Sequence, residues 1–356
     1  MRMTTYRTRM GDGHLIDVTS DDIRRDILAG SEDAADRGRI PPLPQEEQDY
    51  LVDLFINPAR AVSVPPGHEV VLSQDGGDTK FYIDSGSSGL GISIGQLEAL
   101  QVAERAFAQD IIEMGQSDYS FKPLKVMFAM EQVHAEEMLL STIAPLMYGA
   151  MTNLGQYYKP DGPFDNPVDL LPVGRVKEAL EAQELAAAHA KRDMVFFSSR
   201  LAEVGIDAMN FDTSAAAGDA EFLAILEAVE EITAAFPTLG IELGMASEFV
   251  LGLHGGLTYK GTRLAGLYPH DQVKVAEQAG VTVFGPVVNT NTGRSTPWNV
   301  SRAVTYVKAC SAVAAIPIHA NVGMGVGGVP MCDTPPVDAV SRASVAMVEI
   351  GKADGL

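Results

Sequence analysis

Short apolar runs alternate with amphipathic stretches along most of this chain, and no other feature limits its possible folds as strongly. Polar and apolar residues do not alternate within the runs, which is typical of strands that are buried on both faces. A strand followed by a helix, repeated many times, predicts parallel strands joined by crossover helices. We expect seven such strands, at residues 89–94, 124–130, 145–150, 208–212, 241–246, 281–288 and 316–322.

Helices with one apolar face are expected between these strands. They cover residues 96–114, 132–142, 173–204, 221–236, 272–279, 298–315 and 337–350. The pattern predicts an α/β fold, a (β/α)8 TIM-type barrel that occupies residues 85–356 and lacks its C-terminal part from the last strand onward. A doubly wound open sheet carries the same pattern and remains the alternative.

Residues 1–84 have a mixed pattern, and we expect them to form an N-terminal extension that packs on the barrel. Helices and small strands are expected within it at 21–30, 45–55, 62–64 and 80–83. At the other end, Leu356 resembles the first residue of an eighth strand. A barrel without that strand exposes two ladder edges, so we expect the natural chain to continue. The alternative is an open sheet whose last element is the helix that ends at Ile350.

The formal net charge of −21 indicates a strongly acidic surface. Such a surface repels nucleic-acid phosphates and anionic membranes, so neither is expected as a partner. It suits a cationic substrate such as a protonated amine, although acidic surfaces also serve solubility alone. The two cysteines, Cys310 and Cys332, lack the spacing of a thiolate zinc site, so no metal is expected. Because the N-terminus has no apolar signal segment either, we expect a cytoplasmic protein.

The functional groups of a barrel gather at the C-terminal ends of its strands. The candidates at this mouth are Glu242, Asp212, His319, Asn289, Asn291 and Asn321. Each has a structural alternative, because Glu242 could pair with a basic side chain and Asp212 could cap the next helix. His319 could equally be a hydrogen-bonded core residue, and Asn289 and Asn291 could simply hold their loop. The residues alone therefore predict an acidic, amide-rich mouth and leave the reaction open.

Several motifs in a fixed order resemble a single family. They are 119–123 (YSFKP), 146–151 (LMYGAM), 160–164 (PDGPF), 210–213 (NFDT), 284–287 (FGPV), 289–292 (NTNT) and 323–328 (GMGVGG). From about Met10 to Leu356, the ordered set resembles the dimethylamine:corrinoid protein methyltransferases, which contain pyrrolysine. No single motif identifies the family, whereas the ordered series of motifs is highly specific to it.

The resemblance implies a barrel enzyme whose pyrrolysine, encoded by an in-frame amber codon, follows a tripeptide like Asp354-Gly355-Leu356. It therefore implies a chain truncated at that codon and inactive in this form. The implied reaction moves a methyl group from dimethylamine to the Co(I) corrinoid of a cognate protein and releases monomethylamine, in methylamine catabolism or methanogenesis. The corrinoid (cobalamin) is carried by that partner protein, so no cofactor is expected on this chain. The chain is expected to form a homo-oligomer.

In the implied reaction the imine of pyrrolysine accepts the amine, and carboxylates suit this chemistry because they can protonate the imine and stabilise a cation. Glu242 is our first choice as proton donor, with Asp212, His319 and Asn289 as further catalytic candidates. Asn291 and Asn321 are the candidates for substrate binding. Two other functions stay open: a zinc-dependent corrinoid methyltransferase, which would need thiolate ligands, and a non-catalytic barrel that binds amines or the corrinoid protein.

Overall fold

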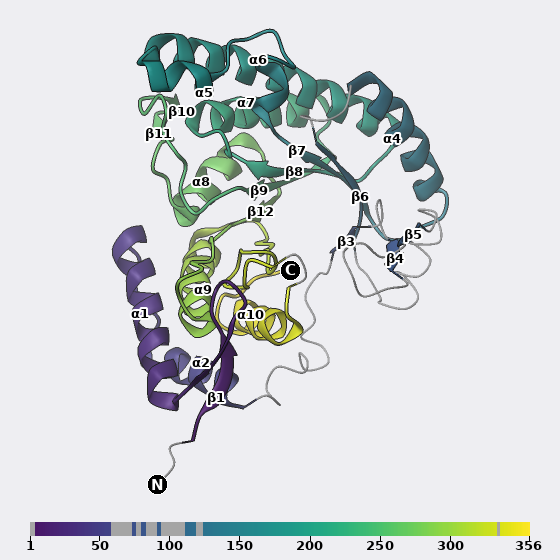
Figure 1. Ribbon diagram of the computed structural model, residues 1–356. Coiled ribbons are helices and arrows are strands. Elements are labelled where there is room, and N and C mark those ends of the chain that lie inside the picture. The colour runs from purple at the N-terminus through teal and green to yellow at the C-terminus, as the bar shows by residue number, and fades with distance from the viewer. Residues whose placement is uncertain are drawn as a thin grey trace.

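The computed structural model describes residues 4–57, 73–75, 80–82, 91–93, 111–118, 124–332 and 335–356. A six-stranded sheet forms its centre, and all neighbouring strands in it run parallel (Figure 1). In spatial order the strands are β3 (Ser73–Asp75), β6 (Ile111–Asp118), β7 (Leu146–Met151), β8 (Ala208–Ser214), β9 (Gly240–Met245) and β12 (Val283–Gly285). The spatial order follows the chain order, as in a (β/α) barrel. The predicted α/β class is confirmed.

Two isolated bridges carry this strand order further along the sheet. Ile318 pairs in parallel with Phe284 of β12, and Gly355 pairs in parallel with His319. Backbone hydrogen bonds join the same segments, from His319 N to Phe284 O at 2.9 Å and from Ala320 N to Gly355 O at 3.0 Å. Six strands and two bridged segments give eight positions in barrel order, although the described residues show no pairing between the first and the eighth.

Helices lie along the outer side of the curved sheet (Figure 1). They are α4 (Leu124–Leu139), α6 (Val176–Val204), α7 (Asp219–Ala235), α8 (Pro269–Ala279), α9 (Thr296–Val313) and α10 (Val337–Glu349). Short elements occupy the connections: η3 (Leu154–Tyr157), α5 (Pro167–Leu170), η4 (Leu171–Val173), β10 (Thr258–Tyr259) and β11 (Thr262–Arg263). The longest helix, α6, buries a stripe of alanines together with Phe197 and Leu201. It ends at Gly205, whose φ of 105° lets its amide bond back to Leu201.

The N-terminal segment packs against the last third of the chain. It comprises the hairpin β1 (Tyr6–Arg9) and β2 (Leu15–Val18), then α1 (Ser20–Gly38) and α2 (Gln45–Ile56). Helix α1 approaches α9 closely at Gly30, where a Cβ would lie 2.2 Å from the carbonyl oxygen of Trp298. Gly11 donates its amide to Arg294 O at 2.7 Å and accepts from Met331 N at 2.9 Å. The start of the chain thereby holds two loops that follow the last strands.

Four of the predicted strands are confirmed as β7, β8, β9 and the shorter β12, but three expectations near the start of the sheet are wrong. Residues 124–130 belong to helix α4, because a short apolar run does not distinguish a strand from a buried helix. Residues 111–114 of the predicted helix 96–114 begin strand β6, and the rest of that helix lies outside the described residues. Within the predicted strand 89–94, Gly91–Ser93 forms β5, but it pairs antiparallel with β4 (Lys80–Tyr82), outside the large sheet.

The expectations for residues 1–84 have a mixed outcome. Both helices exist, and α1 runs on to Gly38, well past the predicted segment 21–30. The small strand predicted at 80–83 appears as β4, whereas 62–64 lies outside the described residues. Strand β3 also comes from this segment and joins the large sheet, so the sheet begins before residue 85. The division into extension and barrel remains a prediction.

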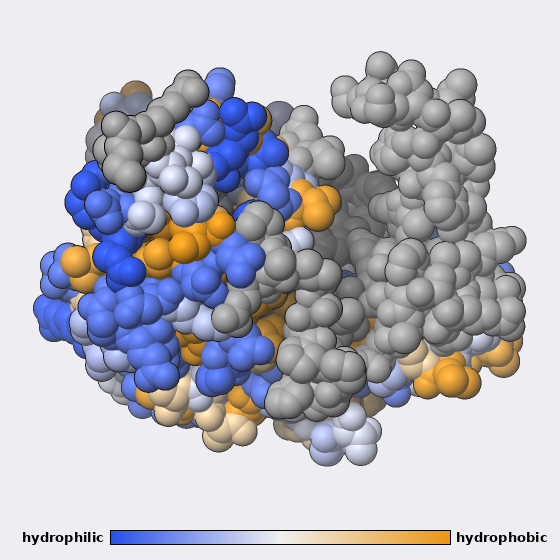
Figure 2. Space-filling model, turned by 90° about the horizontal axis from the view of Figure 1, so that it is seen from below, coloured by the Kyte–Doolittle hydropathy of each residue, from blue (hydrophilic) through white to orange (hydrophobic). Residues whose placement is uncertain are grey.

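On the face shown in Figure 2, the described residues are mainly hydrophilic, with smaller hydrophobic patches among them. This agrees with the acidic composition, a net charge of −21. Among the described residues, no helix is both long and apolar enough to cross a bilayer.

Candidate active site

A cavity of about 330 Å³ lies at the C-terminal ends of the parallel strands. Its lining comprises Glu113 from β6, Asn210 and Asp212 from β8, Glu242 and Gly244 from β9, Gly285 from β12, Val287, His319, Ala320, Asn321, Val322 and Leu356. Side chains from several separate strands meet there because parallel strands end at one edge of the sheet. We call this cavity the mouth cavity.

Glu242 and His319 form an ion pair in the mouth cavity. Glu242 Oε1 and His319 Nδ1 lie 2.5 Å apart, and both side chains are largely buried. Burial lowers the pKa of His319, but the hydrogen bond and charge of Glu242, the backbone of Leu356 and the charge of Glu113 together raise that pKa to about 9. The imidazole is therefore protonated at neutral pH, and the pair holds one proton between a carboxylate and a ring nitrogen.

A second pair of buried polar side chains lies beside the first. Asn210 Nδ2 donates to Glu113 Oε1 at 3.2 Å, and each residue is less than a tenth exposed. The Oδ1 atom of Asn210 is buried without a hydrogen-bond partner among the described residues. An orphaned acceptor of this kind costs free energy unless a ligand or water satisfies it. Asn210 therefore offers a bound molecule a place to donate a hydrogen bond.

Asp212 depends on glycine at the neighbouring position of β9. A Cβ on Gly244 would lie 2.7 Å from Asp212 Oδ1, closer than real contacts allow. The same oxygen accepts from the amide of Thr213 at 2.7 Å. Thr213 and Ala215 both have positive φ, 55° and 64°, a conformation that costs free energy in residues other than glycine. The backbone is therefore strained at the end of β8, where the Asp212 carboxylate reaches the cavity.

The structure places the sequence-predicted residues in two groups. Glu242, Asp212, His319 and Asn321 line the mouth cavity, whereas Asn289 and Asn291 line a separate cavity of about 400 Å³. The Oδ1 atom of Asn291 accepts from Gly293 N at 2.9 Å, and the backbone of Asn291 is bonded on both sides by the side chain of Asn299. These contacts fix the loop, which is the structural role that the sequence left open for Asn291.

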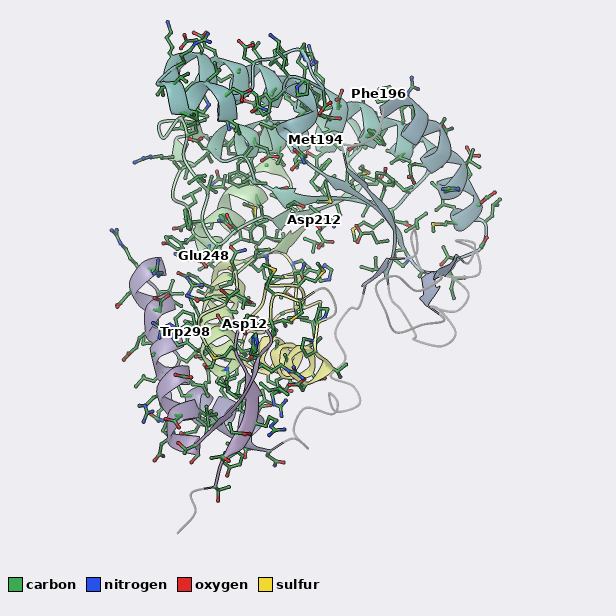
Figure 3. The ribbon with its side chains drawn as sticks, in the orientation of Figure 1. Asp12, Met194, Phe196, Asp212, Glu248 and Trp298 are labelled. Carbon is green, nitrogen blue, oxygen red and sulfur yellow. The ribbon has the colours of Figure 1, made fainter. Side chains whose placement is uncertain are left out.

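The separate cavity is built around Arg302 rather than around a strand end. Arg302 makes a bidentate contact to Glu248, with both N–O distances at 2.6 Å, and donates Nε to Asp33 at 2.7 Å. Its guanidinium also lies over the rings of Trp298 and Tyr306. Figure 3 shows Glu248 and Trp298 toward α1 and α9, away from Asp212. Arg302 thus pairs with both Glu248 and Asp33, which is typical of a structural cluster.

Sequence reasoning missed Glu113 and did not select Asn210. Glu113 fell within a predicted helix, so its position at a strand end was hidden. A local signal existed, because Ile112-Glu113-Met114 and Ile241-Glu242-Leu243 both place one carboxylate inside an apolar run. Asn210 belongs to the family motif at 210–213 and lies two residues before Asp212, which was a catalytic candidate.

The mouth cavity has the electrostatics of a cation site. Glu113, Asp212 and Glu242 contribute three carboxyl groups, and none of the lining residues that the structure describes is Lys or Arg. His319 offsets one of these charges through its pair with Glu242. In the described part of the chain, no three His, Cys, Asp or Glu side chains are grouped so that they could hold a metal ion. The arrangement can bind a small cation and can deliver a proton to a base beside it.

A profile of the dimethylamine methyltransferase family matches residues 4–356. Among solved structures, a methyltransferase from Methanosarcina mazei is 10% identical, with 85% of this chain and 98% of that chain covered and a TM-score of 0.36. Dihydropteroate synthase of Xanthomonas albilineans is 14% identical, with 81% and 85% covered and a TM-score of 0.38. Homocysteine methyltransferase of Escherichia coli is 11% identical, with 70% and 85% covered and a TM-score of 0.33. Likenesses at these scores add nothing to the family match.

Proposed function

The chain belongs to the dimethylamine methyltransferase family, and from that premise we propose that its mouth cavity binds dimethylamine for methyl transfer to the Co(I) corrinoid of a cognate corrinoid protein, with release of monomethylamine. The charge of the cavity is the observation that carries this proposal. Three carboxyl groups surround a space without Lys or Arg among its described lining residues. Carboxylates around a small space stabilise an ammonium ion and any positive charge that develops on it.

We place the reactive residue, pyrrolysine, directly after Leu356. Leu356 lines the mouth cavity, and its backbone bonds to the ring of His319. The next Cα along a trans chain lies about 3.8 Å away, so the following side chain begins beside the Glu242–His319 pair. The ring imine of that residue supplies an electrophilic carbon for the amine.

The Glu242–His319 pair is the proton source in this proposal, rather than Glu242 alone. His319 carries the proton at neutral pH, since its pKa is raised to about 9, and Glu242 holds the ring in place at 2.5 Å. A nitrogen base bound next to the pair can accept that proton through a short hydrogen bond. Asp212 and Glu113 then balance the positive charge that remains in the cavity, and Asn210 keeps Glu113 oriented. Asn321 is the remaining polar group for orienting the amine.

The corrinoid stays on the partner protein, so this chain contributes a binding surface and the cavity below it. We propose that the enzyme works in the cytoplasm as a homo-oligomer, in methylamine catabolism or methanogenesis. A non-catalytic amine-binding barrel and a zinc-dependent methyltransferase are the competing functions, and both are outcomes of the experiment that follows.

The test uses the full-length protein produced with pyrrolysine, together with the cognate corrinoid protein reduced to Co(I). Methyl transfer is followed by the absorbance change on formation of methyl-Co(III), with dimethylamine, monomethylamine, trimethylamine or methanol as methyl donor. We expect turnover with dimethylamine that survives zinc chelation. Amine binding without any corrinoid methylation would support the non-catalytic function, and activity that a chelator abolishes would support the zinc enzyme.

A matched pair of variants tests the site within the same assay. Glu242→Gln keeps the size of the side chain but removes the charge that holds the proton of His319, so turnover should fall at least about a hundredfold. Glu203→Gln is the control, because Glu203 is an exposed carboxylate at the C-terminal end of α6 that pairs only with Arg200 in the described structure. Equal turnover in the two variants would remove Glu242 from the mechanism.

A further inference from the structure

A further cavity, of about 440 Å³ and with both polar and apolar lining residues, lies beside the mouth cavity. The chain after β7 forms one wall, the chain after β8 forms another, and α6 and α7 close it with Gln183 and Glu221. We call it the Glu221 cavity. It is separated from the mouth cavity by the end of β8, where Thr152 N donates to Asp212 O at 3.3 Å. No residue of the proposed methyl-transfer mechanism lines it.

One backbone peptide fixes both of its principal side chains. Ala217 N donates to Glu221 Oε2 at 2.6 Å, and Gln183 Nε2 donates to Ala217 O at 2.6 Å. Each side chain is therefore anchored by one terminal atom. The other terminal atom, Oε1 in both residues, is buried without a hydrogen-bond partner among the described residues. Glu221 is 1% exposed and Gln183 is 5% exposed, so bulk water does not satisfy these oxygens.

The structural role of Glu221 uses only one of its two carboxylate oxygens. An acidic residue in the first turn of a helix commonly accepts from the backbone just before the helix, and the bond from Ala217 is of this kind. The other oxygen, Oε1, accepts no such backbone hydrogen bond. An unpaired oxygen of a buried carboxylate costs free energy, and a bound cation would remove that cost.

Two hydroxyl groups complete the set of polar atoms. The hydroxyl of Tyr158 is buried and has no partner among the described residues. Burial and then the charge of Glu221 raise the pKa of Tyr158, so the phenol stays neutral and faces the field of that carboxylate. The Thr152 hydroxyl lies close enough to Glu221 to lower its pKa, yet it falls outside hydrogen-bond geometry. None of the described lining residues is Lys, Arg or His.

The polar atoms therefore form an acceptor set around one negative charge: a carboxylate oxygen, an amide oxygen and two hydroxyl oxygens. Met151, Leu154, Pro167 and Val168 contribute apolar side chains, and Asn153, Asn166 and Thr213 contribute further polar ones. The side-chain oxygens of both asparagines already accept hydrogen bonds from backbone amides. An inorganic cation would need oxygen ligands on all sides, which this mixed lining does not provide. A primary ammonium group presents three N–H donors on one end and a small alkyl group on the other, and it matches both parts.

We propose that the Glu221 cavity is a binding site for a small primary alkylammonium ion, held by Glu221, Gln183 and Tyr158. The site stands on its own contacts and does not depend on methyl transfer in the mouth cavity. If methyl transfer takes place as proposed, its product, monomethylamine, is a ligand of this class and is released next to the cavity.

The pH dependence of binding follows from Glu221. Burial raises the pKa of Glu221 to about 7, although the Ala217 amide and the Thr152 hydroxyl act against that rise. Tyr158 is the other titratable residue among the described lining, and Asp219 on the same helix is bonded to the amides of His254 and Gly255 instead. Affinity should therefore increase about tenfold from pH 6 to pH 8, since the ionised fraction of Glu221 rises by that amount.

The experiment is an isothermal titration of the full-length protein with methylammonium chloride, with potassium chloride as the inorganic probe. Glu221→Gln keeps the contact with Ala217 but removes the charge, and Tyr158→Phe removes an atom that has no structural partner. We expect at least about tenfold weaker binding in Glu221→Gln and a measurable loss in Tyr158→Phe at an unchanged melting temperature. Glu242→Gln is the control for the mouth cavity and should retain this binding.

Three results would overturn the inference. The first is equal affinity for methylammonium in wild type, Glu221→Gln and Tyr158→Phe. The second is a complete loss of methylammonium binding in Glu242→Gln, which would leave water as the occupant of the Glu221 cavity. The third is competition by potassium at equal concentration, which would assign the cavity to an inorganic cation. Corrinoid methylation is measured separately, so a failure of the proposed function and a failure of this site are distinguishable.

Discussion

Replacing Glu242 with glutamine should change the protonation of His319 by a measurable amount. In the wild-type protein, burial lowers the pKa of His319, but Glu242, Leu356 and Glu113 together raise it from 6.5 to about 9. The variant loses both the charge and the accepting carboxylate at 2.5 Å, while burial persists. The pKa of His319 should therefore fall in Glu242→Gln, because its two largest raising causes are lost while burial still lowers it.

The free energy involved follows from the size of the shift. One pKa unit corresponds to about 1.4 kcal/mol, so a rise from 6.5 to about 9 favours the protonated ring by about 3 kcal/mol in the folded state. A pKa that is raised on folding adds stability that is fully present below the unfolded value and lost as the pH rises through the folded value. The unfolding free energy of the wild type should therefore decline by about 3 kcal/mol from this group between pH 6.5 and pH 9.

Two measurements check this prediction. The Cε1–H resonance of His319, assigned with His319→Gln, is titrated by NMR in the wild type and in Glu242→Gln. Urea unfolding is measured at pH 6.5 and pH 9.5 in the same proteins, with Glu203→Gln as the control. Two results would refute the ion pair as the cause of the raised pKa of His319. One is a titration midpoint of His319 near 6.5 in the wild type, and the other is a difference in unfolding free energy between wild type and Glu242→Gln that does not shrink as the pH rises.

Three other predictions test the surroundings of the site. Gly244→Ala should displace the Asp212 carboxylate, because the new Cβ would lie 2.7 Å from Oδ1, and we expect at least about tenfold lower turnover in steady-state kinetics with a melting temperature within a few degrees of wild type. A large loss of stability without loss of turnover would contradict it. Arg302→Met should lower the unfolding free energy by about 3–5 kcal/mol in urea titrations, since Glu248 would be left buried without its bidentate partner. If pyrrolysine follows Leu356, as proposed above, the codon at that position should be amber, and the 356-residue product alone should not methylate the corrinoid protein. Another stop codon there, or an active 356-residue product, would remove pyrrolysine from the mechanism.

Much of the site was predictable because strand ends are visible in the pattern of apolar residues. Asp212 and Glu242 stand in apolar runs that form β8 and β9, and the register between these strands places Asn210 opposite Glu242. His319 follows from the same reasoning, since Ile318 lies beside Phe284 of β12. In each case a buried strand with a polar residue near its end was sufficient to place the side chain at the mouth.

The remaining part depended on information that local pattern does not carry. Residues 124–130 form a helix although their apolar run suits a strand, because continuation of the same segment to Leu139 decides its conformation. Because a strand was predicted there, the segment that forms β6 was predicted as part of a helix, and Glu113 was not recognised at a strand end. Asn291 was expected at the mouth, but its loop turns toward α9 and is held there by Asn299, a contact that no strand pattern predicts.

The N-terminal segment has a consequence for synthesis of the chain. Helix α1 buries Ile23 and Ile27, and its contacts to α9 lie about 270 residues later, as in the bond from Ser301 Oγ to Ile27 O. A ribosome releases α1 long before α9 exists, so the side of α1 that packs on α9 has no partner while the sheet is being made. The two loops that Gly11 joins, at Arg294 and Met331, are likewise made late in synthesis. The nascent protein is therefore open to aggregation or chaperone capture at the side of α1 that faces α9, and a ribosome-bound chain should bury that side only after α9 has left the exit tunnel.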